Sequence, residues 1–181
     1  MQRFAWAPWG LLLVVLDLRV GLWDVLPDVV GFAWLVVALT GAERVGRPFV
    51  LARSAAMVGV PAALVTGTPL LAVSRPLLVA ALVVQAAAFA VALWALASGV
   101  LEHSDDEAAR RWAARLRPAA AALGVLLVLT DPAVYLVTSA SALAVPVSLL
   151  WLLARLAEAV VGVLVVVLLQ RVARSGELRP A

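Results

Sequence analysis

Cysteine and lysine are both absent from the 181-residue chain, and only one histidine, His103, is present. Without cysteine there is no disulfide, no thiolate nucleophile and no cysteine-ligated metal. A single histidine does not supply the histidine pair or triad of common zinc sites. A glycine-rich phosphate loop and a serine–histidine arrangement are missing as well. The sequence therefore predicts a protein that is not an enzyme and that uses no metal and no cofactor.

Charged residues are also scarce, at 14% of the chain, whereas hydrophobic residues make up 65%. The mean hydropathy is +1.08. A soluble domain has about 25% charged residues, and a chain of this size cannot bury so much apolar surface. We therefore expect an all-α integral membrane protein whose main partner is the lipid bilayer. The arginines are scattered between apolar runs, so the high pI of 10.9 does not indicate a nucleic-acid partner.

Six apolar segments approach the length of about 20 residues that crosses a bilayer. These segments are 4–22, 25–42, 54–73, 77–98, 119–137 and 146–169. The second is the weakest, because only the 14 residues from Val29 to Ala42 are uninterrupted, so it either spans with a tilt or re-enters the membrane. The prediction is a single-domain bundle of six transmembrane helices, of which the first is retained and not cleaved as a signal peptide.

The distribution of arginine predicts the orientation. With a cytoplasmic N-terminus, eleven arginines fall in cytoplasmic segments and two in outer segments. The eleven are Arg3, Arg44, Arg47, Arg53, Arg110, Arg111, Arg115, Arg117, Arg171, Arg174 and Arg179, and the two are Arg19 and Arg75. Because cytoplasmic loops carry the excess of positive charge, we expect both termini in the cytoplasm.

A polar stretch at about 104–117 separates the fourth and fifth segments. It starts with Ser104-Asp-Asp-Glu107, the pattern of a capping box, and its arginines follow toward the end. Its apolar residues share one face, which predicts an amphipathic helix on the cytoplasmic membrane surface. A docking helix for a cytoplasmic partner is the alternative. Four arginines are candidate contacts for anionic lipids: Arg110, Arg111, Arg115 and Arg117.

Ionisable residues inside the apolar segments are the candidate functional residues, because an unpaired charge there costs at least about 2.5–3.5 kcal/mol. Glu158 falls near the bilayer midplane, with Arg155 about one turn away on the same face. Arginine has five donors, so we expect Arg155 to contact Asp17 or Asp131 as well. The candidate ion- or substrate-binding residues are Asp17, Asp131, Arg155 and Glu158. Gln85 is expected to hydrogen-bond across a helix interface.

Neutral polar residues gather in the outer half of the predicted bundle, whereas its inner half is nearly all alanine, valine and leucine. This asymmetry predicts an outward-facing acidic pocket with Arg155 and Glu158 at its floor. One reading is transport of a cation, a proton or a small molecule. The alternative is a non-catalytic scaffold or accessory subunit, as a homo-oligomer or with a membrane partner, in which the buried charges fix helix packing.

The segment Leu16–Phe32 contains the pattern D-x-L-P-D-x-x-G from Asp24 to Gly31. It resembles the N-terminal segment of small multi-pass bacterial membrane proteins in which D-x-LP-[D/N]-x-x-G joins the first two helices. The resemblance implies a bacterial inner-membrane location but no activity. It singles out Asp17, Asp24, Pro27, Asp28 and Gly31. From the residues themselves, Asp24 and Asp28 are expected to cap the second helix.

Overall fold

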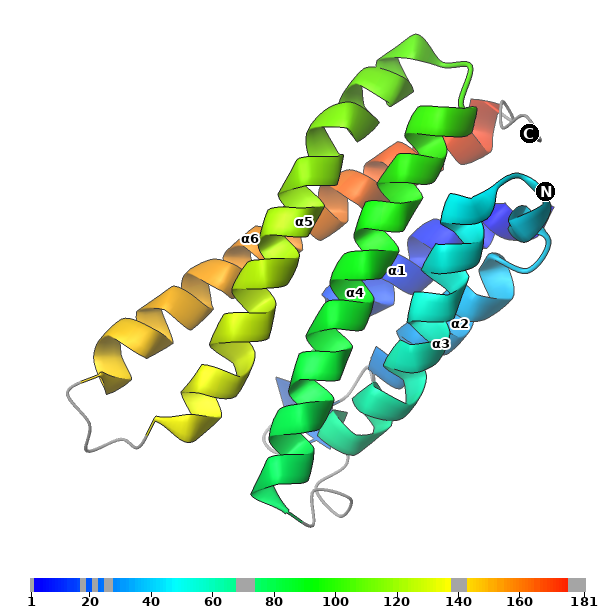
Figure 1. The fold of residues 1–181 in the computed structure, drawn as a ribbon. Helices are drawn as coiled ribbons and strands as arrows, with labels where there is room; N and C mark the ends of the chain where they lie inside the picture. The colour runs from blue at the N-terminus through cyan, green and yellow to red at the C-terminus, as the bar shows by residue number, and fades with distance from the viewer. Residues whose placement is uncertain are drawn as a thin grey trace.

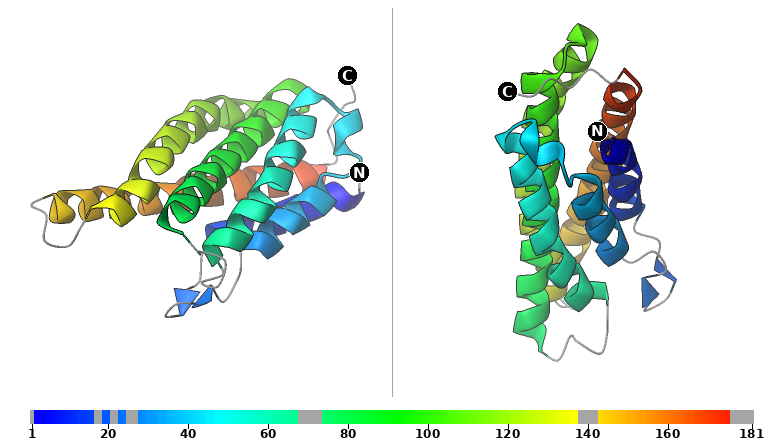
Figure 2. Two further views of the ribbon diagram at one scale, coloured as in Figure 1. Left: turned by 60° about the horizontal axis from the view of Figure 1, so that its bottom comes forward. Right: turned by 90° about the vertical axis from the view of Figure 1, so that its right-hand side faces the viewer.

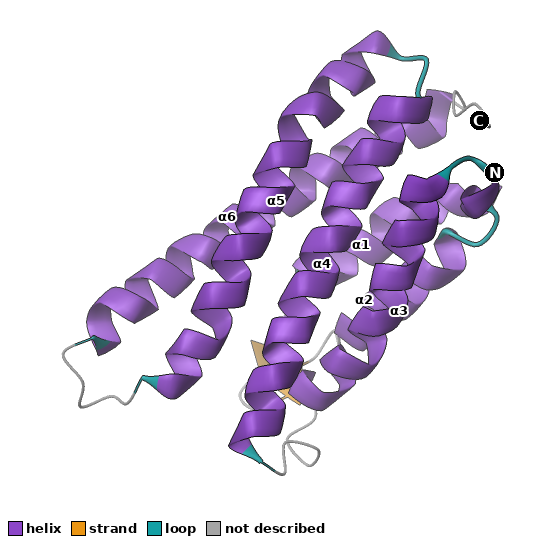
Figure 3. Ribbon diagram, viewed as in Figure 1, coloured by secondary structure: helices purple, strands orange, loops and turns teal. Residues whose placement is uncertain are grey.

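The computed structural model describes residues 2–16, 19–20, 23–24, 28–67, 74–137 and 143–175. The described chain is helical apart from one short antiparallel pair, β1 (Arg19–Val20) and β2 (Trp23–Asp24) (Figures 1 and 3). The predicted all-α class is therefore confirmed for the bundle. Asp17 and Pro27 lie outside the described residues.

The helices follow one another with short connections. In chain order they are the 3-10 helix η1 (Gln2–Trp6), α1 (Ala7–Val15), α2 (Asp28–Ala38), the 3-10 helix η2 (Ala42–Arg44), α3 (Arg47–Gly67), α4 (Arg75–His103), α5 (Glu107–Leu136) and α6 (Ala144–Ser175). Four of them are long and apolar enough to cross a membrane: α3, α4, α5 over Glu107–Val134, and α6. The protein is thus a membrane protein. The first two predicted segments are represented by shorter apolar helices, Arg3–Val15 and Asp28–Ala38.

The six α-helices form a closed ring in two layers. Helices α3, α4 and α5 lie side by side in the front layer of Figure 1, and α2, α1 and α6 lie behind them (Figures 1 and 2). Each helix packs on its neighbour in sequence, and α1 packs against α6 to close the ring. At this closure Gly162 of α6 lies directly against Val15 of α1. The ring encloses a continuous apolar core.

Two glycines allow α1 and α2 to pack closely. A Cβ atom at Gly31 would lie 2.8 Å from the backbone nitrogen of Val14, and one at Gly10 would lie 2.9 Å from that of Leu35. Small residues at helix contacts in membranes let the backbones approach and gain van der Waals packing. Gly31, which the D-x-LP-D-x-x-G pattern singled out, is therefore a contact point between these two helices.

The structure differs from the predicted surface helix at 104–117. That stretch is the beginning of α5, which runs without interruption through Pro118 and Pro132. Its residues Ala109, Ala113 and Leu116 are buried in the core. This part of the apolar face packs on the protein, whereas Trp112 is 42% exposed, so the separate surface helix is not confirmed. Arg117, one of the four arginines predicted to contact anionic lipids, stacks over the Trp94 ring, with its Cζ 4.9 Å from the ring centroid.

The N-terminus of α5 is capped by Asp106 and not by Ser104. The Asp106 Oδ1 atom accepts from the backbone amides of Ala108 at 2.9 Å and Ala109 at 3.2 Å, whereas Ser104 Oγ accepts from the Asp106 amide at 3.3 Å. Arg171, near the end of α6, also donates to the Asp106 carboxylate. This Arg171 hydrogen bond is the largest cause that lowers the pKa of Asp106 below its ordinary value of 3.8, with the two amides adding to it.

Candidate functional site

Arg155 and Glu158 on α6 meet Asp131 on α5 in the interior of the bundle. One guanidinium nitrogen of Arg155, Nη2, lies 3.0 Å from Asp131 Oδ2, and the other, Nη1, lies 2.6 Å from Glu158 Oε2. Asp131 and Glu158 are only 4% and 8% exposed. The predicted contact of Arg155 with Asp131 in addition to Glu158 is therefore confirmed.

The helix geometry of α6 explains the position of the guanidinium. Trp151, Arg155 and Glu158 follow one another at intervals of four and three residues, so they lie on one face of α6. The Arg155 Cζ atom lies 5.6 Å from the centroid of the Trp151 ring. A cation over an aromatic ring is favourable, and more so away from water. The arginine is thus held from two directions, by the two carboxylates and by the indole.

A second set of polar side chains adjoins this triad. Gln85 of α4 donates through Nε2 to the carboxylate of Asp28 at the start of α2, and Thr66 of α3 donates to Gln85 Oε1. The predicted hydrogen bond of Gln85 across a helix interface is confirmed, and it reaches two helices. Asp28 is 7% exposed, and its carboxylate accepts this hydrogen bond from α4 inside the bundle.

Both sets of residues face one small cavity. Its volume is about 20 Å³, and its polar lining comes from Asp28, Gln85, Asp131, Arg155 and Glu158. Its apolar walls come from Val14, Phe32, Leu82, Ala86, Phe89 and Leu127. This volume is sufficient for one water molecule. Arg155 and Glu158, predicted to lie at the floor of an outward-facing pocket, thus line a cavity for one water molecule.

The cavity is acidic. Among the described residues that line it, three are carboxylic acids, Asp28, Asp131 and Glu158, and one is a cation, Arg155. Excess charge of one sign is costly in a low-dielectric interior, so protonation of a carboxylate or binding of a cation lowers the energy of such a group. In the described part of the chain, no three histidine or acidic residues are arranged to hold a metal ion. Acidic side chains gathered around one arginine can take up and release protons.

The structure unites three of the four sequence-predicted site residues, Asp131, Arg155 and Glu158, and the fourth, Asp17, lies outside the described residues. Asp28 joins them, although the sequence indicated only capping for it. The sequence contained a signal for this position, because Asp28 shares one helical face with the apolar residues Phe32 and Leu35. In the structure all three residues are buried. Asp24 lies in β2.

The polar cluster of Asp28, Gln85, Asp131, Arg155 and Glu158 thus draws on four of the six helices, and Thr66 adds a fifth. The resemblance of the segment from Leu16 to Phe32 to a family of bacterial membrane proteins stays a prediction. No protein-family model, no curated protein and no solved structure matches this chain.

Proposed function

We propose that this protein is a small multi-pass membrane protein that transfers protons through the polar cluster. The observation that carries the proposal is the cavity of about 20 Å³, whose described lining contains three carboxylic acids and one arginine. An organic substrate does not fit into a space for one water molecule, whereas a proton and a relaying water do. Intramembrane carboxylates that face a bundle interior are typical of proton pathways.

Arg155 gives the cluster a way to exchange a proton without losing its ion pair. The guanidinium cannot be deprotonated in a protein, and it contacts both Asp131 and Glu158. When one of these carboxylates takes up a proton, the other keeps Arg155 paired. Proton uptake and release therefore leave no unpaired guanidinium in the interior, which is the costly state.

The proposal includes six crossings with both termini in the cytoplasm of a bacterial inner membrane. In support, η1, the end of α6 and the α4–α5 turn lie toward the same end of the molecule (Figure 1). The excess of arginine in these segments favours the cytoplasmic side for that end. Reporter fusions in the α4–α5 turn and after Ser175 should both be cytoplasmic, and a reporter between α5 and α6 should be external. A fusion that contradicts this alternation overturns the span count.

Proton flux into proteoliposomes tests the function directly. The purified chain is reconstituted with a pH-sensitive dye inside the vesicles, and a potassium gradient with valinomycin sets the membrane potential. We expect Glu158→Gln and Asp131→Asn to lower the flux at least tenfold, because each removes one exchangeable proton and keeps the side-chain shape. Glu107→Gln is the matched control, because Glu107 is exposed at the start of α5 and far along the helix from Asp131.

Size-exclusion profiles show whether each variant is folded, so that a loss of proton flux is not mistaken for a loss of folding. A wild-type flux equal to that of protein-free vesicles, or a full flux in Glu158→Gln, overturns the proposal. The second candidate function is then favoured: a scaffold or accessory subunit. The specific observation for it is that the same contacts join α5 to α6 and α4 to both α2 and α3, so they also fix the helix packing.

A further inference from the structure

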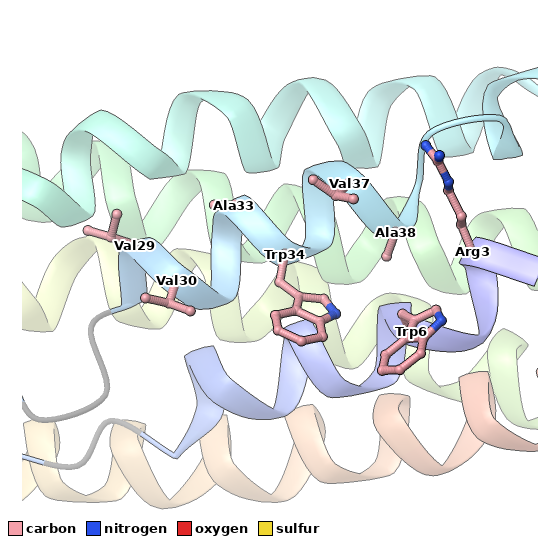
Figure 4. A pocket seen from close by; sticks show the side chains of 8 residues that line it. All are labelled: Arg3, Trp6, Val29, Val30, Ala33, Trp34, Val37 and Ala38. Carbon is pink, nitrogen blue, oxygen red and sulfur yellow. The ribbon is translucent and has the colours of Figure 1, made fainter.

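A separate groove lies along α2, outside the polar cluster (Figure 4). Arg3 and Trp6 of η1 form one side, and Val30, Trp34 and Val37 of α2 form the other, together with smaller side chains. Its volume is about 740 Å³, so it is far larger than the cavity of the cluster. A groove of this volume has room for part of a lipid molecule.

The groove has a polar end and an apolar end. Arg3 lies beside the end of α2, near Val37 and Ala38, whereas Val29 and Val30 lie at the other end (Figure 4). Between these ends are the rings of Trp6 and Trp34, whose centroids are 5.9 Å apart with planes at 46°. Tryptophan concentrates at membrane interfaces, because its ring is apolar and its N–H donates to polar groups. Along this groove, the charged Arg3 is followed by the two tryptophan rings and then by the aliphatic side chains of Val29 and Val30.

The indole rings of Trp6 and Trp34 are both exposed. Trp6 is 53% exposed and Trp34 is 41% exposed. Exposed aromatic rings leave apolar area for a ligand, and in a membrane protein the surrounding lipid supplies one. The helix of 11 residues that forms the long wall rises about 16 Å, close to the depth of one leaflet of a hydrocarbon core of about 30 Å.

We propose that this groove binds one anionic phospholipid, with the phosphate at Arg3 and an acyl chain along α2. The commitment to an anionic lipid rests on charge complementarity: among the described residues that line the groove, the one charged side chain is the Arg3 guanidinium, at one end of an otherwise apolar surface. Guanidinium groups bind phosphate oxygens in pairs, with short charge-assisted hydrogen bonds. The site is distinct from the arginines of α5, because Arg110 and Arg111 are exposed and do not line this groove.

Native mass spectrometry of the detergent-solubilised chain tests the site. Palmitoyl-oleoyl phosphatidylglycerol and the matching phosphatidylcholine are added in equal amounts, and the lipid retained by each protein ion is counted. We expect one retained phosphatidylglycerol in preference to phosphatidylcholine. Arg3→Gln should lower the ratio of the two bound lipids at least tenfold, because it removes the charge and leaves the apolar groove. Arg110→Gln is the matched control and should leave the ratio unchanged.

Variants of the apolar wall complete the test. Trp34→Ala should lose both lipids, whereas Trp9→Ala should lose neither, because Trp9 is a comparably exposed ring on α1 that does not line the groove. Ala33→Phe inserts a ring into the groove from an exposed position, so it blocks the acyl chain without removing any packing. Equal retention of both lipids by the wild type overturns the proposal. Wild-type lipid retention in Ala33→Phe also overturns it. A two-chain species that Trp34→Ala dissociates would show that a second copy, and not a lipid, occupies the groove.

Discussion

Arg155 of α6 lies 3.0 Å from the carboxylate of Asp131 of α5, and this contact bridges two neighbouring helices inside the bundle. Asp131 is almost fully buried, with 6% of its side chain exposed, while 24% of the Arg155 side chain is exposed. In such a pair the cost of losing one partner exceeds the gain from forming the pair, because the remaining charge is left in a poor solvent. The pair is therefore the place where single substitutions have the largest effect.

We expect Arg155→Met to destabilise the protein by about 3–5 kcal/mol, the usual cost of breaking a buried ion pair. Methionine keeps much of the apolar stem but leaves Asp131 and Glu158 without this cation. Thermal unfolding in detergent measures the effect. The double variant Asp131→Asn, Arg155→Met should be less destabilised than the sum of the two single variants, because the charges interact directly. Strict additivity would show that the contact contributes no coupling.

Gln85→Leu should destabilise more than Thr66→Val. The leucine variant removes the hydrogen bonds to both Asp28 and Thr66 and leaves a buried carboxylate with one donor fewer, which costs about 1–3 kcal/mol. The valine variant removes one hydrogen bond between helices, and such bonds average about 0.6 kcal/mol in membranes. Chemical unfolding of both variants under one condition gives the order. The reverse order would show that the Asp28–Gln85 contact is not important for stability.

Gly31→Ala should weaken the packing of α1 on α2. The added methyl group would lie 2.8 Å from the Val14 backbone nitrogen, so one helix must move, at a cost of about 1–3 kcal/mol. Ala114→Val is the control, because it adds volume at an exposed position of α5. Melting temperatures that fall for Gly31→Ala and not for the control would confirm the close approach. Equal melting temperatures would contradict it.

The pH dependence of stability should contain a contribution from Asp106. Its pKa in the folded protein lies below its ordinary value of 3.8, mainly because Arg171 donates a hydrogen bond to it. The ionised carboxylate therefore stabilises the fold above pH 3.8, and this stabilisation is lost as the pH falls below 3.8 through the folded value. Asp106→Asn keeps a good helix cap and lacks the charge.

The difference in unfolding free energy between wild type and Asp106→Asn should thus be constant near neutral pH and shrink in acid. Arg171→Gln should reduce the same pH-dependent contribution, because it removes the principal cause of the lowered pKa. Denaturant titrations at several pH values between neutral and strongly acidic measure both differences. If the difference in unfolding free energy does not vary with pH, the Asp106–Arg171 pair contributes nothing to the pH dependence of stability.

Hydropathy alone located the four long membrane helices, but it placed their ends poorly. The third segment was expected to begin at residue 54, whereas α3 begins at Arg47. A hydropathy window shows where side chains avoid water, while a helix continues as far as its backbone hydrogen bonds do. The apolar stripe at the start of α5 was recognised in the sequence, but a stripe does not reveal whether it meets lipid or protein. Here it meets the protein, through Ala109 and Ala113.

The triad in the site was partly predictable, because the cost of a buried charge requires Arg155 to have partners on other helices. The contribution of Asp28 was not predicted, since a residue near a helix start has a sufficient local explanation as a cap. Its contact with Gln85 joins residues 57 positions apart and depends on how the ring brings the start of α2 within side-chain reach of α4. A contact between residues so far apart in the chain depends on the tertiary structure, which a local sequence pattern does not reveal.

The closure of the ring by α1 against α6 has a consequence for synthesis of the chain. The first helix leaves the ribosome long before the last one, so α1 cannot reach its final neighbour until the whole chain has been inserted. Asp131 likewise precedes Arg155 in the chain, so it reaches the membrane before Arg155 does. Every nascent chain therefore passes through a stage in which an acidic side chain in the bilayer has yet to meet its arginine. Chains truncated before α6 keep Asp131 without its arginine, so the ion pair that joins α5 to α6 never forms in them.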